Sequence, residues 1–166
     1  MTDHPPADLP ARGPRISLPS FGAVQIPSGP PSIDEARAHL GGRAGSGPGA
    51  GRRVRVEGMR AGPVEGVVVH ASGDELDVWI GGGRFARVSP GACQDTDVEV
   101  ESLAEVARAA ARFAALREGD AVTYLDRAGA SHVGVLIEKC RYGALVSSAR
   151  GTVLAVSFQR VSSAPR

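Results

Sequence analysis

An internal repeat limits the possible folds more than any other feature of this chain. Residues 51–95 and residues 119–166 carry the same order of short apolar runs and glycine-bearing turns, and a shift of 68 residues aligns them. The identical pairs in this alignment include Val54 with Val122, Gly66 with Gly134, Val67 with Val135, Val78 with Val146, Gly83 with Gly151, Val88 with Val156, and Ser89 with Ser157. The repeat predicts two related folding units in one chain.

The apolar runs inside each repeat have the pattern of short strands. Leu76, Val78 and Ile80 alternate with polar or outward positions, as in a half-buried strand. Glycine-rich turns separate the runs at spacings typical of all-β units. Small closed barrels bury one face of their sheet and have no free edges. We therefore expect an all-β protein with two tandem five-stranded small barrels, one at residues 51–95 and one at residues 119–166.

Residues 96–118, between the repeats, change from the period of a strand to that of a helix. The apolar positions at helical spacing are Leu103, Val106, Ala107, Ala110, Phe113 and Ala114. Ser102 and Glu105 have the spacing of a capping box, and Gly119 stands where a helix C-terminus favours glycine. We expect one amphipathic linker helix that begins near Ser102 and lies with one side on a barrel.

Residues 1–50 differ from the rest in composition. They hold nine of the twelve prolines and eight glycines, so they cannot bury enough apolar surface to offset the entropy of ordering. We expect a disordered N-terminal tail. Within it, residues 16–27 have the pattern of an extended segment that binds a partner's groove or sheet edge. The apolar side chains of this segment are Ile16, Leu18, Phe21, Val24 and Ile26.

A second segment of the tail has helix signals. Ser32 and Glu35 have capping-box spacing, and Gly41 follows where the helix would stop. A helix of about two turns is too short to be stable by itself. The alternative for this segment, as for residues 16–27, is a chance cluster within a linker.

The start of the second repeat resembles a KOW motif on a small barrel of the Src-homology type. The matching residues are Gly119-Asp120-Ala121-Val122, then Arg127-Ala128-Gly129, then Val133-Gly134-Val135-Leu136-Ile137. The first repeat is similar at residues 53–56 and 66–69 but lacks the opening Gly-Asp pair. Because KOW-type and Tudor-type barrels bind RNA, DNA, ribosomal partners, polymerases or modified peptides, the resemblance implies a binding module.

A fainter resemblance is to PilZ receptors for cyclic di-GMP. Arg52, Arg53 and Arg55 precede a turn in the order that this family uses. The sequence departs from the family at His70, where an acid or amide is needed, and at Glu75, where a glycine is needed. Both departures remove residues that would clamp the nucleotide, so we expect no such cofactor.

The sequence has no motif typical of an enzyme. It lacks a nucleophile elbow, a phosphate-binding loop and a GxGxxG in a βαβ unit, so we expect no catalytic residues and no small-molecule substrate. Cys93, Cys140, His70 and His132 do not form the closely spaced pairs of a zinc site, so we expect no metal.

The chain also has no signal of a membrane protein. It has no apolar run of about 18 residues and no signal-peptide core, which predicts a cytoplasmic protein with no membrane contact. Eighteen of the 19 basic residues are arginine, a coding bias that indicates a bacterial source.

These features favour a protein partner or a larger assembly. The formal net charge is only +1, so bulk electrostatics does not require nucleic acid. Trp79 alternates out of phase with its inward-facing neighbours, and an outward Trp is a common interface anchor. The alternative is that Trp79 covers the linker helix or the other barrel. We expect a structural or interaction protein that uses Trp79 and the tail segment.

Nucleic acid is the alternative ligand. The turn of the second repeat is Lys139-Cys140-Arg141-Tyr142, whereas the corresponding turn of the first is Ser72-Gly73-Asp74-Glu75. A basic, aromatic turn can contact phosphate and stack on a base. The candidate residues for this role are Arg127, Lys139, Arg141, Tyr142, Arg150 and Arg160.

Overall fold

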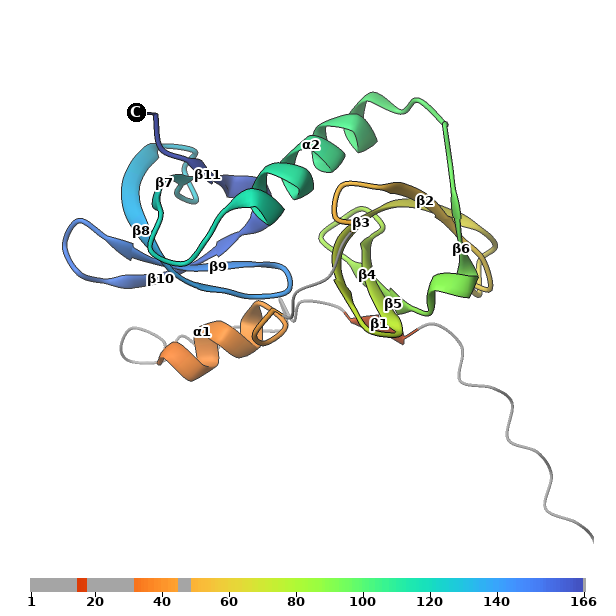
Figure 1. Ribbon diagram of the computed structural model, residues 1–166, viewed down its shortest axis with the longest axis horizontal. Helices are drawn as coiled ribbons and strands as arrows, with labels where there is room; N and C mark the ends of the chain where they lie inside the picture. The colour runs from red at the N-terminus through yellow and green to blue at the C-terminus, as the bar shows by residue number, and fades with distance from the viewer. Residues whose placement is uncertain (1–14, 18–31, 45–48, 166) are drawn as a thin grey trace, which may run out of the picture.

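The computed structural model describes residues 15–17, 32–44 and 49–165, which form two antiparallel sheets and two α-helices (Figure 1). The first sheet has the strand order β1-β5-β4-β3-β2-β6, and the second has the order β10-β9-β8-β7-β11. The prediction of a largely all-β chain is confirmed. None of the helices in the described ranges is both long and apolar enough to cross a membrane.

The bounds of the elements follow the chain. Those of the first sheet are β1 (Arg15–Ser17), β2 (Arg53–Val56), β3 (Val64–Ser72), β4 (Glu75–Trp79), β5 (Phe85–Val88), the 3-10 helix η1 (Pro90–Ala92) and β6 (Cys93–Asp95). Those of the second sheet are β7 (Ala121–Leu125), β8 (Ser131–Lys139), β9 (Gly143–Ser148), β10 (Val153–Ser157), the 3-10 helix η2 (Phe158–Arg160) and β11 (Val161–Ser163). The α-helices are α1 (Ile33–His39) and α2 (Glu101–Ala115).

The strand pairing repeats with the same shift as the sequence. Val54 lies opposite Gly66 in the first sheet, and Val122 lies opposite Gly134 in the second. The register shifts between Val68 and His70 in β3, and between Leu136 and Glu138 in β8, which are equivalent positions. The two repeats therefore share strand order, register and the position of a β-bulge.

At the equivalent positions 66 and 134, the same close contact with the neighbouring strand requires glycine. A Cβ atom at Gly66 would lie 2.5 Å from the carbonyl oxygen of Trp79, and one at Gly134 would lie 2.5 Å from that of Ser147. The second strand of each repeat thus passes so close to the third that no side chain fits between them.

We expect Gly134→Ala to lower the free energy of unfolding by about 1–3 kcal/mol, because the added methyl group must displace the backbone of β9. Urea denaturation measures this loss. Gly91→Ala is the matched control, because a Cβ there meets nothing within 4 Å and its φ is not positive. Equal stability of the two variants would contradict the account of the close strand contact.

The linker helix α2 begins earlier than predicted. Its N-cap is Val100, which has extended backbone angles and makes no side-chain capping bond, so the predicted capping box of Ser102 and Glu105 is wrong. The carbonyl of Val100 accepts the first helical bond, from the amide of Ala104, and Ser102 therefore lies inside the helix. The side chains that α2 buries are Leu103, Val106, Ala109, Ala110 and Phe113.

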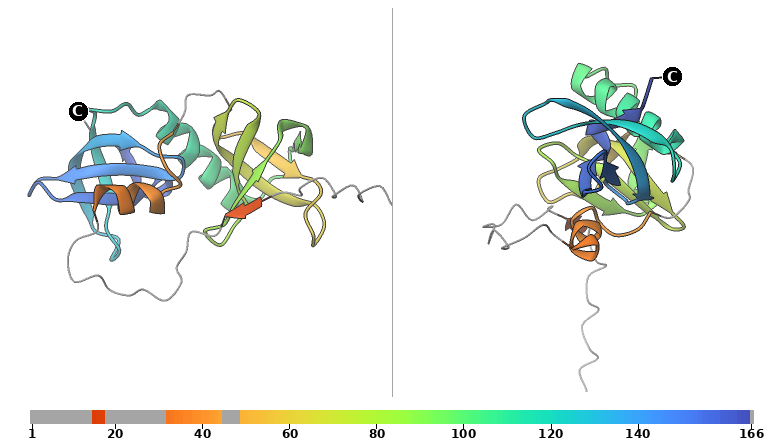
Figure 2. Two further views of the ribbon diagram at one scale, coloured as in Figure 1. Left: turned by 90° about the horizontal axis from the view of Figure 1, so that it is seen from below. Right: turned by 90° about the vertical axis from the view of Figure 1, so that its left-hand side faces the viewer.

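Helix α1 corrects the prediction of a disordered tail for residues 32–44. Its capping box is confirmed, since the amide of Glu35 donates to Ser32 Oγ and the amide of Ser32 donates to the Glu35 carboxylate. Ala36 and Leu40 pack on Cys140 and Leu145 of the second repeat. Helix α1 therefore lies against β9 and β10 (Figure 1 and Figure 2).

The tail also contributes a strand. In β1, Ile16 lies opposite Ala86 of β5, so this part of the predicted partner segment pairs with a sheet edge of its own chain. The remaining apolar residues of that segment, Leu18, Phe21, Val24 and Ile26, lie outside the described residues.

The largest hydrophobic core joins the interior of the second sheet to the contact between the two sheets. It runs from Val67 and Val69 on β3, across the buried face of α2, to Phe158 and Val161 of the second repeat. A smaller core fills the first sheet. Because α2 contacts both sheets, the two repeats pack as one body around this helix.

Candidate functional site

An apolar stripe is exposed on the second sheet. Its side chains are Leu125 of β7 and Val133, Val135 and Ile137 of β8, with exposed fractions of 40%, 60%, 46% and 42%. We call these four residues the β7–β8 outer face. The β8 members alternate with Gly134, Leu136 and Glu138, which are buried, so β8 carries apolar side chains on both of its sides. Contiguous exposed apolar side chains of this kind mark interaction sites on soluble proteins.

The equivalent face of the first sheet is covered. Val67 and Val69 of β3 correspond to Val135 and Ile137, yet their exposed fractions are 0% and 4%. They belong to the core cluster that contains the buried residues of α2. The same strand face is therefore covered by a helix in one repeat and open in the other.

The residues around the two faces differ in polarity. Beside the covered Val67 and Val69, the first sheet carries Arg53, Arg55, Glu57 and Glu65, of which Arg55 is exposed and the others are partly buried. The corresponding residues of the exposed face are Ala121, Thr123, Leu125 and Val133. At these four positions the second sheet is thus the more apolar of the two, and Leu125 and Val133 are exposed there.

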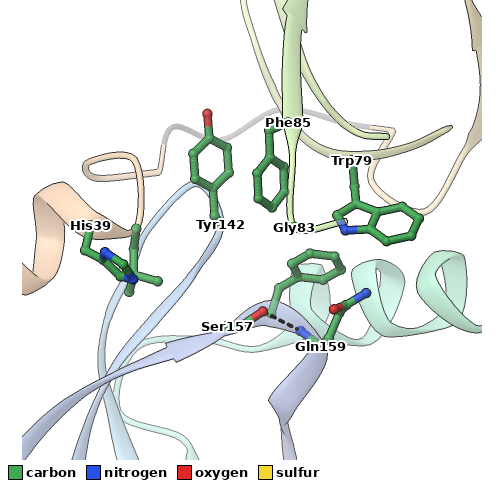
Figure 3. A pocket seen from close by; sticks show the side chains of 9 residues that line it. His39, Trp79, Gly83, Phe85, Tyr142, Ser157 and Gln159 are labelled. Atoms are coloured by element: carbon green, nitrogen blue, oxygen red, sulfur yellow. Dashed lines mark hydrogen bonds between the residues drawn. The ribbon is translucent and has the colours of Figure 1, made fainter. Parts of the chain in front are cut away.

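The contact between the two sheets is aromatic. Phe85 of β5 stacks on Tyr142, with ring centroids 3.9 Å apart, and meets Phe158 edge-on at 6.2 Å. With Trp79 they line a small cavity of about 110 Å³, in which Tyr142 stands beside Phe85 (Figure 3). The cavity is also lined by His39, Leu40, Gly83, Ser157 and Gln159.

Trp79 takes the second of its two predicted positions. It points away from the interior of the first sheet, as the alternation predicted, but it is partly buried against the core between the sheets. Its position agrees with the alternative that Trp79 covers the helix or the other repeat. Binding of a partner through this side chain stays a prediction.

A buried carboxylate ties the two sheets together beside this aromatic contact. Asp77 of β4 lies 3.0 Å from Nδ1 of His70 and accepts hydrogen bonds from Arg87 Nε at 3.1 Å, Arg141 Nη1 at 3.4 Å and Tyr142 Oη at 3.3 Å. Burial raises the pKa of Asp77, but the bonds from His70 and Arg87 outweigh it and hold this pKa below its ordinary value. Asp77 therefore remains ionised between the repeats at neutral pH.

Three of the six nucleic-acid candidates are used inside the molecule. Tyr142 is buried against Phe85, and Arg141 pairs with Asp77. Lys139 donates to the carbonyls of Ala114 and Leu116 at the end of α2 and lies 5.0 Å from the ring centroid of Phe113. Burial lowers the pKa of Lys139.

The other three candidates are exposed. Arg127 lies in the turn between β7 and β8, and Arg150 lies in the turn between β9 and β10. Arg160 donates to the carbonyl of Asp126 at 3.0 Å. The six residues thus divide into an internal group and an exposed group.

The cysteines are both free thiols. Cys140 is buried under α1, and this burial raises its pKa to about 11, so it stays protonated at neutral pH. Cys93 is half-buried in β6, and burial raises its pKa as well. In the described part of the chain, no three His, Cys, Asp or Glu side chains form a group that could hold a metal ion.

No protein-family model matches this sequence, and no curated protein matches it significantly. The likeness to KOW-type barrels therefore rests on the quoted residues alone.

Proposed function

We propose that this chain is a non-enzymatic interaction or assembly protein, and that its second repeat binds a protein partner through the β7–β8 outer face. The observation that carries the proposal is the contrast between Val135 and Ile137, which are exposed, and Val67 and Val69, which a helix covers. Exposed apolar side chains gain free energy when a partner removes them from water.

We further propose that each sheet closes into a small barrel. In each repeat the last short strand returns to pair with the first, β6 with β2 and β11 with β7. A sheet whose ends approach in this way has few free edges, as in small barrels that serve as binding modules. The proposal agrees with the likeness of the second repeat to KOW-type barrels.

The alternative of a nucleic-acid ligand has less support. A phosphate-binding surface needs arginine and lysine side chains that are free to reach the backbone. Arg141 and Lys139 already make contacts within the protein, and Tyr142 is not open for stacking on a base. Arg127 and Arg150 are the exposed residues on which this alternative would now depend.

Photo-crosslinking in cells of the source organism tests the proposal. We expect benzoylphenylalanine at position 135 to give one discrete protein adduct, and the same group at the exposed Thr152 to give none. Excess wild-type protein should compete for the adduct, whereas Val135→Glu protein should not, because a glutamate would have to be buried without a partner.

Two results would overturn the proposal. One is the absence of any adduct at position 135 above the level at position 152. The other is an adduct that nuclease treatment removes, which would favour nucleic acid as the ligand.

A further inference from the structure

The internal repeat also indicates what kind of partner fits the β7–β8 outer face. We propose that this face binds an amphipathic helix of a partner protein, laid across β8 as α2 lies across β3. The inference rests on the proposed function and specifies the ligand of the same site. The first repeat is the example of such a face with a helix bound to it.

Strands β3 and β8 have the same shape. β3 and β8 have the same length of nine residues, the same register with their neighbours and a bulge at the same position. Their outward side chains at equivalent positions therefore share one geometry. A surface that accepts a helix on Val67 and Val69 presents the same outline at Val135 and Ile137.

The backbone of α2 comes close to a glycine of the first repeat. A Cβ atom at Gly51, just before β2, would lie 3.0 Å from the carbonyl oxygen of Ala107 and 3.0 Å from the Cβ of Ala111, both in α2. The equivalent residue of the second repeat is Gly119, and a Cβ there would meet nothing within 4 Å. The space that α2 fills beside the first sheet is thus open beside the second.

The two faces also differ in polarity. Beside the covered Val67 and Val69, the first sheet has the partly buried Glu57 and Glu65 where the second sheet has Leu125 and Val133. A helix on the second sheet would therefore meet a wider apolar surface than α2 does. We expect the partner helix to carry apolar residues at helical spacing, with small residues such as alanine where it passes Gly119.

A peptide of residues 98–117, which contains α2, is the probe for this inference. Isotope-labelled full-length protein is titrated with it, and backbone amide shifts are followed by NMR. We expect saturable shifts at the amides of β7 and β8, and no such shifts in the Val135→Glu protein. A peptide with Ala109→Pro differs at one residue but cannot form the same helix, so we expect it to bind roughly tenfold or more weakly.

The outcomes separate this inference from the proposed function. Equal binding of the proline peptide would overturn the helix inference and leave a docking face for extended chains. Absence of binding by either peptide, beside a position-135 adduct that Val135→Glu protein fails to displace, would overturn the helix inference alone. No peptide binding and no adduct would overturn both.

Two other occupants of the face are visible in the same experiments. A dimer that the Val135→Glu substitution abolishes would show that a second copy covers the face, and would overturn the inference. Contacts in the NMR spectra between the Val135 methyl groups and residues 18–31 would show that the chain covers its own face, and would also overturn it.

Discussion

Replacing Asp77 by alanine is expected to lower the free energy of unfolding by roughly 3–5 kcal/mol, because removal of one member of a buried ionic cluster leaves the others without compensation. The Asp77 side chain is only 2% exposed and lies within hydrogen-bonding distance of His70 and Arg87 of the first repeat and of Arg141 of the second. Urea denaturation followed by fluorescence measures the loss, since Trp79 is the single tryptophan and lies at the contact between the sheets.

The matched control is Asp74→Ala in the exposed turn between β3 and β4. A surface substitution of this kind changes stability by about 0.5 kcal/mol or less. If the Asp77 variant unfolded at the same urea concentration as the Asp74 variant, the buried cluster would contribute nothing to the contact between the repeats.

The same carboxylate predicts how stability depends on pH. Because its pKa in the folded protein lies below the ordinary value of 3.8, Asp77 contributes stability that is present above pH 3.8 and is lost as the pH falls through the folded-state pKa. The difference in stability between wild type and Asp77→Ala should therefore narrow as the pH falls below 3.8.

Much of the fold follows from the repeat and from local signals. The shift of 68 residues predicts which strands are equivalent, and the capping box of Ser32 and Glu35 predicts α1. The contacts that hold α1 in place join residues that are far apart in the sequence. Arg37 donates to Glu138 at 2.6 Å across 101 residues of sequence, and no short-range pattern predicts such a contact. The Pro-rich composition around α1 therefore led to the wrong prediction of a disordered tail at residues 32–44.

The contact between the repeats could not be predicted from either repeat alone. Phe85, Tyr142 and Phe158 meet there, but their equivalents in the other repeat are Val153, Asp74 and Pro90. The aromatic residues thus break the symmetry of the repeat. A basic turn that packs inward has the same residue types as one that binds phosphate, so Arg141 and Tyr142 fitted the nucleic-acid alternative equally well.

The β7–β8 outer face did leave a signal in the sequence. Residues 133–137 are apolar or glycine throughout, a pattern typical of a strand that is buried on both sides. Comparison with the charged equivalents Glu57 and Glu65 would have shown that the second repeat is the more apolar at this face. Which of its two sides is covered depends on the path of α2, and only the three-dimensional arrangement shows that.

The second large effect concerns binding by this face. We expect the double variant Leu125→Glu and Val133→Glu to weaken partner binding at least roughly tenfold, because two carboxylates would be buried against an apolar surface. Its own folding should be unchanged, since both side chains are exposed and the first repeat carries Glu57 and Glu65 at the same positions. Arg150→Glu, in an exposed turn, is the control that alters charge without altering this face.

The most direct test uses the partner that photo-crosslinking identifies, purified without the crosslink. Its affinity for the wild type, for Arg150→Glu and for the double variant is measured by titration calorimetry, and the thermal unfolding of the three proteins is measured in parallel. The account predicts wild-type affinity for Arg150→Glu, an affinity lower by at least roughly tenfold for the double variant, and equal unfolding temperatures for all three. A double variant that binds the partner as tightly as the wild type would contradict the claim that the β7–β8 outer face is the docking surface.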